Sequence, residues 1–155
     1  SPRTARAAEG LSSWQHIEAP QAGFAEQVYL MQAAGDSSNW SEAMLATQDK
    51  TRGFSVKFDT STLPYFNLWK NTCAIEDGYV VGLEPATGFP NPRSFEESKG
   101  RVIPLAGGES KAFRMILTPM TDEASVANAI ERIQKLHPAT AKTLPVPQSK
   151  CSADA

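Results

Sequence analysis

The sequence predicts a mainly β protein, a β-sandwich with one short C-terminal helix. Short runs of strand composition recur between clusters of turn residues, such as Gly35–Asn39 and Asp49–Gly53. In one run Phe54, Val56 and Phe58 alternate with polar residues, which is the period of a half-buried strand. Helical periodicity is confined to the region after residue 120. An α+β domain is the alternative fold class.

Seven segments are expected to form strands, each bounded by turn residues. Pro64 opens the fourth of them, and Ala106-Gly107-Gly108 precedes the last. In chain order the expected strands are residues 26–32, 42–48, 54–59, 65–70, 78–84, 101–105 and 111–117.

One helix is expected over residues 120–138. Thr121 has the residue type of an N-cap, and Asp122 and Glu123 place negative charge in the first turn. Apolar residues then recur at a spacing of three and four between Val126 and Leu136, and Pro138 ends the pattern. Such a stripe predicts a helix that packs on the outside of the sandwich.

These elements divide the chain into four regions. Residues 1–22 form a polar lead-in segment with a short ordered stretch, and residues 23–119 form the β-sandwich domain. Residues 120–138 are the outer helix, and residues 139–155 are expected to be a flexible tail because they are rich in proline and polar residues.

The composition of the chain indicates which classes of binding partner to expect. The 15 basic and 17 acidic residues are interspersed, so no nucleic acid is expected, and a small polar ligand fits better. No apolar run is long enough to cross a membrane, and no Cys/His cluster predicts a metal site or a cofactor. The two cysteines, Cys73 and Cys151, are expected to be free thiols, and the absence of a signal peptide favours a cytoplasmic protein. The absence of an initiator Met indicates a processed chain or a fragment.

Glu84 is the leading candidate for a catalytic residue. Alternation places Gly82 and Glu84 on one face of a strand, where the glycine leaves space beside the carboxylate. Partial burial at such a position would raise the pKa of the carboxyl toward the range of a general base. The loop that follows, residues 85–95, is rich in proline and glycine yet contains Phe89 and Phe95, which favours an ordered binding loop. A charged residue that only ends a strand at the solvent edge is the alternative.

Several motifs in succession resemble the aldose 1-epimerase (galactose mutarotase-like) superfamily, and most closely its aldose 1-epimerase-like subfamily of unknown-function proteins. The resemblance extends from about Trp14 to Leu117 and corresponds to the C-terminal half of such proteins. The motifs that carry it are Glu26–Tyr29 (Glu-Gln-Val-Tyr), Leu63–Asn71 (Leu-Pro-Tyr-Phe-x-x-Trp-Lys-Asn), Gly82–Asn91 (Gly-Leu-Glu-Pro-Ala-Thr-Gly-Phe-Pro-Asn) and Leu105–Glu109 (Leu-Ala-Gly-Gly-Glu).

The resemblance implies the C-terminal part of a β-supersandwich that binds a free sugar and interconverts its α and β anomers without a cofactor. Glu84 falls on the position of the catalytic base, and Glu26 falls near an acidic sugar-binding position. The acid catalyst of the family is a His from the N-terminal half, and neither His16 nor His137 falls on a motif. The remainder of a parent chain is therefore expected upstream, where it would supply the acid.

Three further residues are candidates for binding the sugar. Trp69 suits stacking on a sugar ring, and Lys70 suits donation to its hydroxyls, although alternation places the two on opposite faces of a strand. Arg93 could bind an anionic sugar, or it could pair with Glu96 or Glu97. A non-catalytic carbohydrate-binding sandwich is the alternative function, and a structural fragment with unpaired strand edges is a third reading.

Overall fold

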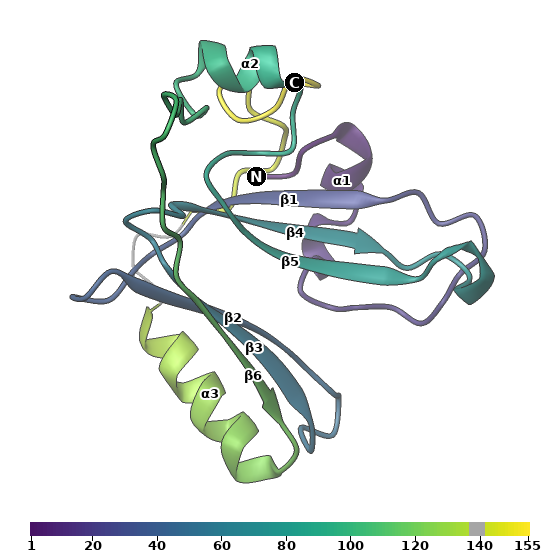
Figure 1. The fold of residues 1–155 in the computed structure, drawn as a ribbon. Helices are drawn as coiled ribbons and strands as arrows, with labels where there is room; N and C mark the ends of the chain where they lie inside the picture. Colours follow the sequence, from purple (N-terminus) through teal and green to yellow (C-terminus); the bar gives the residue numbers. More distant parts are fainter. Residues whose placement is uncertain (137–141) are drawn as a thin grey trace. The chain divides into compact units, whose positions relative to one another are not determined.

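The computed structural model describes residues 1–136 and 142–155, and Figure 1 shows the path of the chain. Strands dominate the described part, as the sequence predicts. In chain order the elements are α1 (Ala5–Glu9), a 3-10 turn (Leu11–Ser13), β1 (Gln27–Gln32), β2 (Trp40–Ala46), β3 (Gly53–Asp59), β4 (Tyr65–Asn71), a second 3-10 turn (Ile75–Asp77), β5 (Val80–Ala86), α2 (Arg93–Ser98), β6 (Met115–Met120) and α3 (Glu123–Leu136).

The chain divides into two units. The first unit comprises Ser1–Gln32, Tyr65–Pro104 and Lys142–Ala155, and the second comprises Ala33–Pro64 and Leu105–Ala141. Residues from the expected lead-in segment and tail therefore belong to the same unit as β1, β4 and β5. Among the described helices, none combines the length and the apolar character that a membrane span requires.

The first unit is built on an antiparallel sheet with the strand order β1-β4-β5 (Figure 1). Its register places Trp69 between Val28 on β1 and Gly82 on β5, and it places Asn67 opposite Glu84. Because cross-strand partners point to the same side of a sheet, the four side chains of Val28, Asn67, Trp69 and Glu84 share the face on which Gly82 leaves space. This is the face that carries the candidate site.

The opposite face of this sheet packs against the beginning of the chain. Thr4 caps α1 by accepting a hydrogen bond from the backbone N–H of Ala7 at 3.1 Å, and Ala7 is fully buried. The ring of Trp14 lies 6.1 Å from the ring of Tyr29, which is also buried. Residues 1–14 thus provide part of the core of the first unit.

The second unit has its own antiparallel sheet, with the order β2-β3-β6, and α3 packs on it. Val126 and Ala129 of α3 are fully buried in a cluster with Met120 and Met44. The helix begins after Asp122, whose carboxylate accepts hydrogen bonds from the backbone N–H and the hydroxyl of Ser125. The N-cap is therefore Asp122 and not Thr121. His137 and Pro138, at the expected end of this helix, lie outside the described residues.

The predicted fold class is confirmed. The described part of the protein is mainly β, with two antiparallel sheets and one long helix after the last strand. The strand expected over residues 101–105 is wrong, because this segment has no regular structure. Arg101 is turned toward Glu96 by a backbone hydrogen bond of 2.9 Å, and Pro104 has no N–H to donate to a strand partner. The short helix α2, inside the loop after Glu84, was not expected.

Candidate functional site

One face of the β1-β4-β5 sheet carries an open pocket of about 230 Å³. All of its lining residues belong to the first unit. They are Arg3, Glu26, Val28, Trp69, Glu84 and Pro90. Three of the residues expected from the sequence, Glu26, Trp69 and Glu84, are therefore brought together at one place.

Glu84 lies within β5 rather than at its end, because the strand continues through Pro85 to Ala86. Proline is tolerated there because β5 is an edge strand of the three-stranded sheet. A β-carbon built on Gly82 would lie 3.1 Å from Cδ of Glu84, so a side chain at position 82 would require the carboxylate to shift from this position. Burial raises the pKa of the Glu84 carboxyl above its ordinary value. A raised pKa moves a carboxyl in a pocket toward the range in which a general base operates.

Trp69 and Glu26 form a second part of the pocket. The indole Nε1 of Trp69 donates a hydrogen bond of 2.8 Å to Oε2 of Glu26, although the two residues are 43 positions apart in the chain. This bond fixes the orientation of the indole ring and occupies one oxygen of the carboxylate. An oriented aromatic ring beside a carboxylate is a suitable surface for a sugar, which stacks its apolar face and donates its hydroxyls.

Three lining residues, Arg3, Val28 and Pro90, are not predicted as site residues by the sequence, and Arg3 is the charged one. Its backbone N–H donates to the carbonyl of Val28 at 2.8 Å, and its guanidinium forms an ion pair of 3.1 Å with Asp154. Residues 3 and 154 are distant in sequence and lie in the segments expected to be a lead-in and a tail. No local signal in the sequence marks either residue, because only the tertiary structure brings the two ends of the chain to the same sheet.

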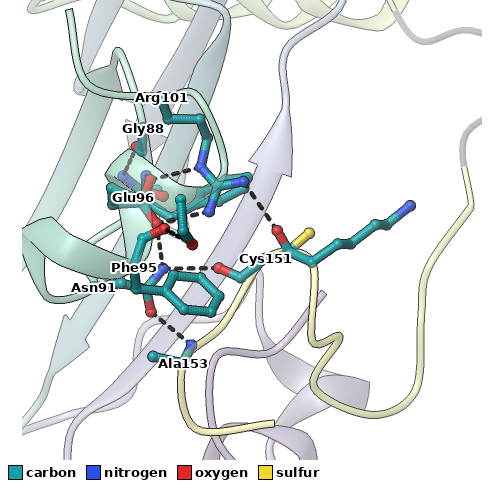
Figure 2. A network of polar contacts seen from close by, with 11 residues as sticks. Gly88, Asn91, Phe95, Glu96, Arg101, Cys151 and Ala153 are labelled. Carbon is teal, nitrogen blue, oxygen red and sulfur yellow. Dashed lines mark hydrogen bonds and ion pairs between the residues drawn. The ribbon is translucent and has the colours of Figure 1, made fainter.

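The loop after Glu84 is held by the polar network that Figure 2 shows around Glu96. The Glu96 carboxylate accepts hydrogen bonds of 2.6 and 2.7 Å from Arg101, one of 2.7 Å from Asn91 and one of 3.0 Å from the backbone N–H of Phe89. Burial by itself would raise the pKa of Glu96, but these donors lower it to about 2. Pro90, which lines the pocket, lies between two residues of this network.

The C-terminal segment completes the network (Figure 2). The side-chain amide of Asn91 donates to the carbonyl of Cys151 at 2.8 Å and accepts from the N–H of Ala153 at 3.0 Å. Arg101 donates to the carbonyl of Lys150 at 2.9 Å. Residues 150–153, expected to be flexible, are therefore bound to the pocket loop in this structure.

Lys70 does not reach the pocket. Its side chain lies on the opposite face of the sheet, as alternation requires, and is fully buried. The ammonium donates 2.6 Å to the backbone carbonyl of His16 and forms an ion pair of 2.9 Å with Glu18. Lys70 thus binds the expected lead-in segment to the sheet. A buried ammonium group is tolerated here because it is hydrogen-bonded and paired with a carboxylate.

Arg93 does not line the pocket either. It is exposed on the first turn of α2. Glu96, one of its two expected partners, pairs with Arg101 instead. Of the alternatives open for Arg93, the pairing with Glu96 is disfavoured, because the fork of the Arg101 guanidinium already occupies both oxygens of that carboxylate.

Replacement of Lys70 by alanine should lower the free energy of unfolding by about 2 kcal/mol, because it removes packing on the sheet and leaves Glu18 without its cation. Lys70→Met keeps most of the apolar stem and should restore more than half of this loss. Urea denaturation of both variants measures the difference. Equal losses in the two variants would contradict the packing contribution.

Two comparisons relate this structure to other proteins. A crystal structure of a protein described as a "putative aldose 1-epimerase" from Klebsiella pneumoniae subsp. pneumoniae matches 95% of this chain, with a TM-score of 0.87 and 32% sequence identity. The match covers 39% of that protein, so this chain spans about two fifths of its length. The likeness supports the predicted placement in the aldose 1-epimerase superfamily, whereas the assignment to a C-terminal half stays a prediction.

The sequence itself gives a family assignment. No curated protein matches the chain. Residues 1–118 match the family model described as "Domain of unknown function (DUF4432)". This match includes β1–β5 and every residue of the pocket lining. The chain therefore belongs to the DUF4432 family.

Proposed function

We propose that the pocket binds a free sugar and that Glu84 is the general base of an aldose 1-epimerase-like reaction. The observation that carries the proposal is the convergence of Glu84, Glu26 and Trp69 on one pocket, in a fold shared with an aldose 1-epimerase-like protein. In this assignment Trp69 stacks on the sugar ring, and Glu26 accepts hydrogen bonds from sugar hydroxyls.

The reaction requires one proton to leave the sugar and another to enter it. Glu84 removes the proton from the anomeric hydroxyl, the bond between the anomeric carbon and the ring oxygen breaks, and an acid protonates the ring oxygen. Rotation about the first carbon–carbon bond exposes the other face of the aldehyde. Ring closure then reverses both proton transfers and gives the other anomer.

None of the six lining residues is a histidine. We therefore assign the acid to a histidine from a further segment of the full-length protein, as the family resemblance implies. His16 is exposed, and its backbone carbonyl is held by Lys70 on the other face of the sheet, which makes it unsuitable for this role.

Anomer exchange, followed by NMR on the full-length protein, tests this proposal. A freshly dissolved pure α anomer of each of several aldoses should reach equilibrium faster with the protein than in buffer alone. Saturation-transfer spectra recorded on the same samples report binding separately.

Together, the exchange and binding measurements distinguish the proposed catalytic function from a second candidate, sugar binding without catalysis. Binding without accelerated exchange would favour a non-catalytic carbohydrate-binding protein, since Trp69 and Glu26 suffice to hold a sugar. The absence of both binding and exchange for every aldose tested would remove the proposal.

A further inference from the structure

The pocket contains one cation and more than one carboxylate. Arg3 is the cationic residue of the lining, while Glu26 and Glu84 are acidic. The guanidinium of Arg3 is paired with Asp154 at 3.1 Å, and the exposed fractions of the two side chains are 22% and 47%. The cation is thus largely enclosed and already has an anionic partner.

We propose that Asp154 masks the charge of Arg3 and thereby makes the pocket selective for uncharged sugars over sugar phosphates. This inference rests on the proposed function, because it concerns the ligand of the same pocket. It assigns a role in specificity to a residue near the end of the described chain.

The position of Asp154 follows from a set of contacts that fix the C-terminal segment. Ser152 is 1% exposed, and its hydroxyl donates a hydrogen bond of 2.6 Å to the backbone carbonyl of Arg3. The same hydroxyl accepts from the backbone N–H of Asp154 at 3.0 Å. Asn91 holds the neighbouring Ala153 at 3.0 Å. The two residues before Asp154 are thus both hydrogen-bonded to the rest of the first unit, and these contacts place Asp154 beside Arg3.

Charge counting gives the direction of selectivity. The pocket lining carries two carboxylates, on Glu26 and Glu84, and one guanidinium, on Arg3, which is paired with a third carboxylate, on Asp154. A phosphate monoester carries a charge of about −1.5 to −2 at pH 7. Like charges brought together in a binding site oppose association, whereas hydroxyls can donate to the free carboxylate oxygens. An uncharged sugar is thus favoured as long as Asp154 offsets Arg3.

Two single variants should shift the selectivity in opposite directions. Asp154→Asn frees the charge of Arg3 and should lower the ratio of affinities, aldose over its 6-phosphate, about fivefold. Arg3→Gln removes the cation and leaves the carboxylates, so the same ratio should rise. In the Arg3→Gln background, the further change of Asp154 to Asn should lower the ratio less than it does in the wild type, because Asp154 then has no cation to mask.

The measurement is an NMR titration of the full-length protein with D-glucose, D-galactose and their 6-phosphates at constant ionic strength. Glu131→Gln is the matched control, since it removes one carboxylate from an exposed ion pair with Lys135 on α3 and should leave the ratio unchanged. Thermal unfolding of each variant shows whether it is folded.

The outcomes separate the inference from the function on which it rests. A wild-type protein that binds the 6-phosphates more tightly, or an Asp154→Asn variant with the wild-type ratio, overturns the masking role and leaves the sugar pocket standing. If Asp154→Asn does not fold, Arg3→Gln becomes the deciding variant. A ratio of affinities in Arg3→Gln that equals the wild-type ratio then overturns the inference. Absence of binding to all four compounds overturns both.

Discussion

Replacement of Glu84 by glutamine should reduce catalysed anomer exchange at least about 100-fold while changing sugar affinity only slightly. The expected loss is that of a general base, which contributes about 100- to 10,000-fold. Glutamine has almost the same shape as glutamate, so it fits the space above Gly82 and still accepts hydrogen bonds, but it cannot take a proton. A large effect on rate with a small effect on binding is the pattern of a group that acts in the transition state.

Under the proposed function, the wild-type protein should also show the titration of Glu84. Because burial raises the pKa of Glu84 above its ordinary value of 4.5, the rate should fall as the pH decreases through this raised pKa. The acidic limb of the pH profile should therefore lie above pH 4.5 and should be absent from the residual activity of Glu84→Gln.

A matched control is available in Glu109, an exposed glutamate whose carboxylate accepts from the backbone N–H of Ala106 at 2.8 Å. Glu109→Gln makes the same chemical change outside the pocket lining and should leave the exchange rate unaltered. Exchange at the wild-type rate in Glu84→Gln would remove Glu84 from the mechanism.

Breaking the pair of Glu96 and Arg101 should have the largest effect on stability. The two side chains are 8% and 9% exposed, and Arg101→Met would leave the Glu96 carboxylate buried without its main donor. Removal of one partner of such a pair costs about 3–5 kcal/mol of unfolding free energy. Urea denaturation measures this loss, and a chemical shift of the pocket residue Trp69 reports whether the loop has moved.

The same pair predicts an acid dependence. Burial would raise the pKa of Glu96, but the hydrogen bonds from Arg101, Asn91 and Phe89 lower it from its ordinary value of 4.5 to about 2. The native state therefore binds this proton more weakly than the unfolded chain does. The stabilisation is therefore complete above pH 4.5 and is lost as the pH falls toward 2, by about 3 kcal/mol in total. Glu96→Gln should be less stable than the wild type at pH 7 and should lose this part of the acid dependence.

An exposed ion pair serves as the comparison. Lys135 and Glu131 on α3 have exposed fractions of 71% and 64%, and Lys135→Met should change stability by no more than about 0.5 kcal/mol. A loss in Arg101→Met as small as in this control would show that the loop around Phe89 does not depend on the buried pair.

Local patterns predicted a large part of the structure. The alternation of Phe54, Val56 and Phe58 marked β3, and the spacing of Val126 and Ala129 marked the buried face of α3. These predictions succeed because strand and helix periodicity depend on neighbours within a few residues. The strand expected over residues 101–105 failed because Arg101 is committed to a charged partner on α2, which composition does not reveal.

The candidate site likewise has features that the sequence predicted and features that it did not. The sequence identified Glu84 and Gly82 on one face of a strand, and it identified Trp69 as an aromatic residue suited to a sugar. It also placed Lys70 on the other face from Trp69, although its fully buried contact with the first 18 residues could not be foreseen. The sequence shows which residues of a motif share a face, because these residues lie close together along one strand.

By itself, the sequence determined the mainly β class, the helix after the last strand, and the positions of Glu84, Glu26 and Trp69 as candidates. Only the tertiary structure decided that these three residues share a pocket, that Arg3 also lines it, and that Asp154, near the other end of the described chain, pairs with Arg3. The physical reason is that strand pairing and burial act between segments distant in sequence. The hydrogen bonds of Arg3 to Val28 and of Ser152 to Arg3 join residues that are 25 or more positions apart, so no local pattern predicts them.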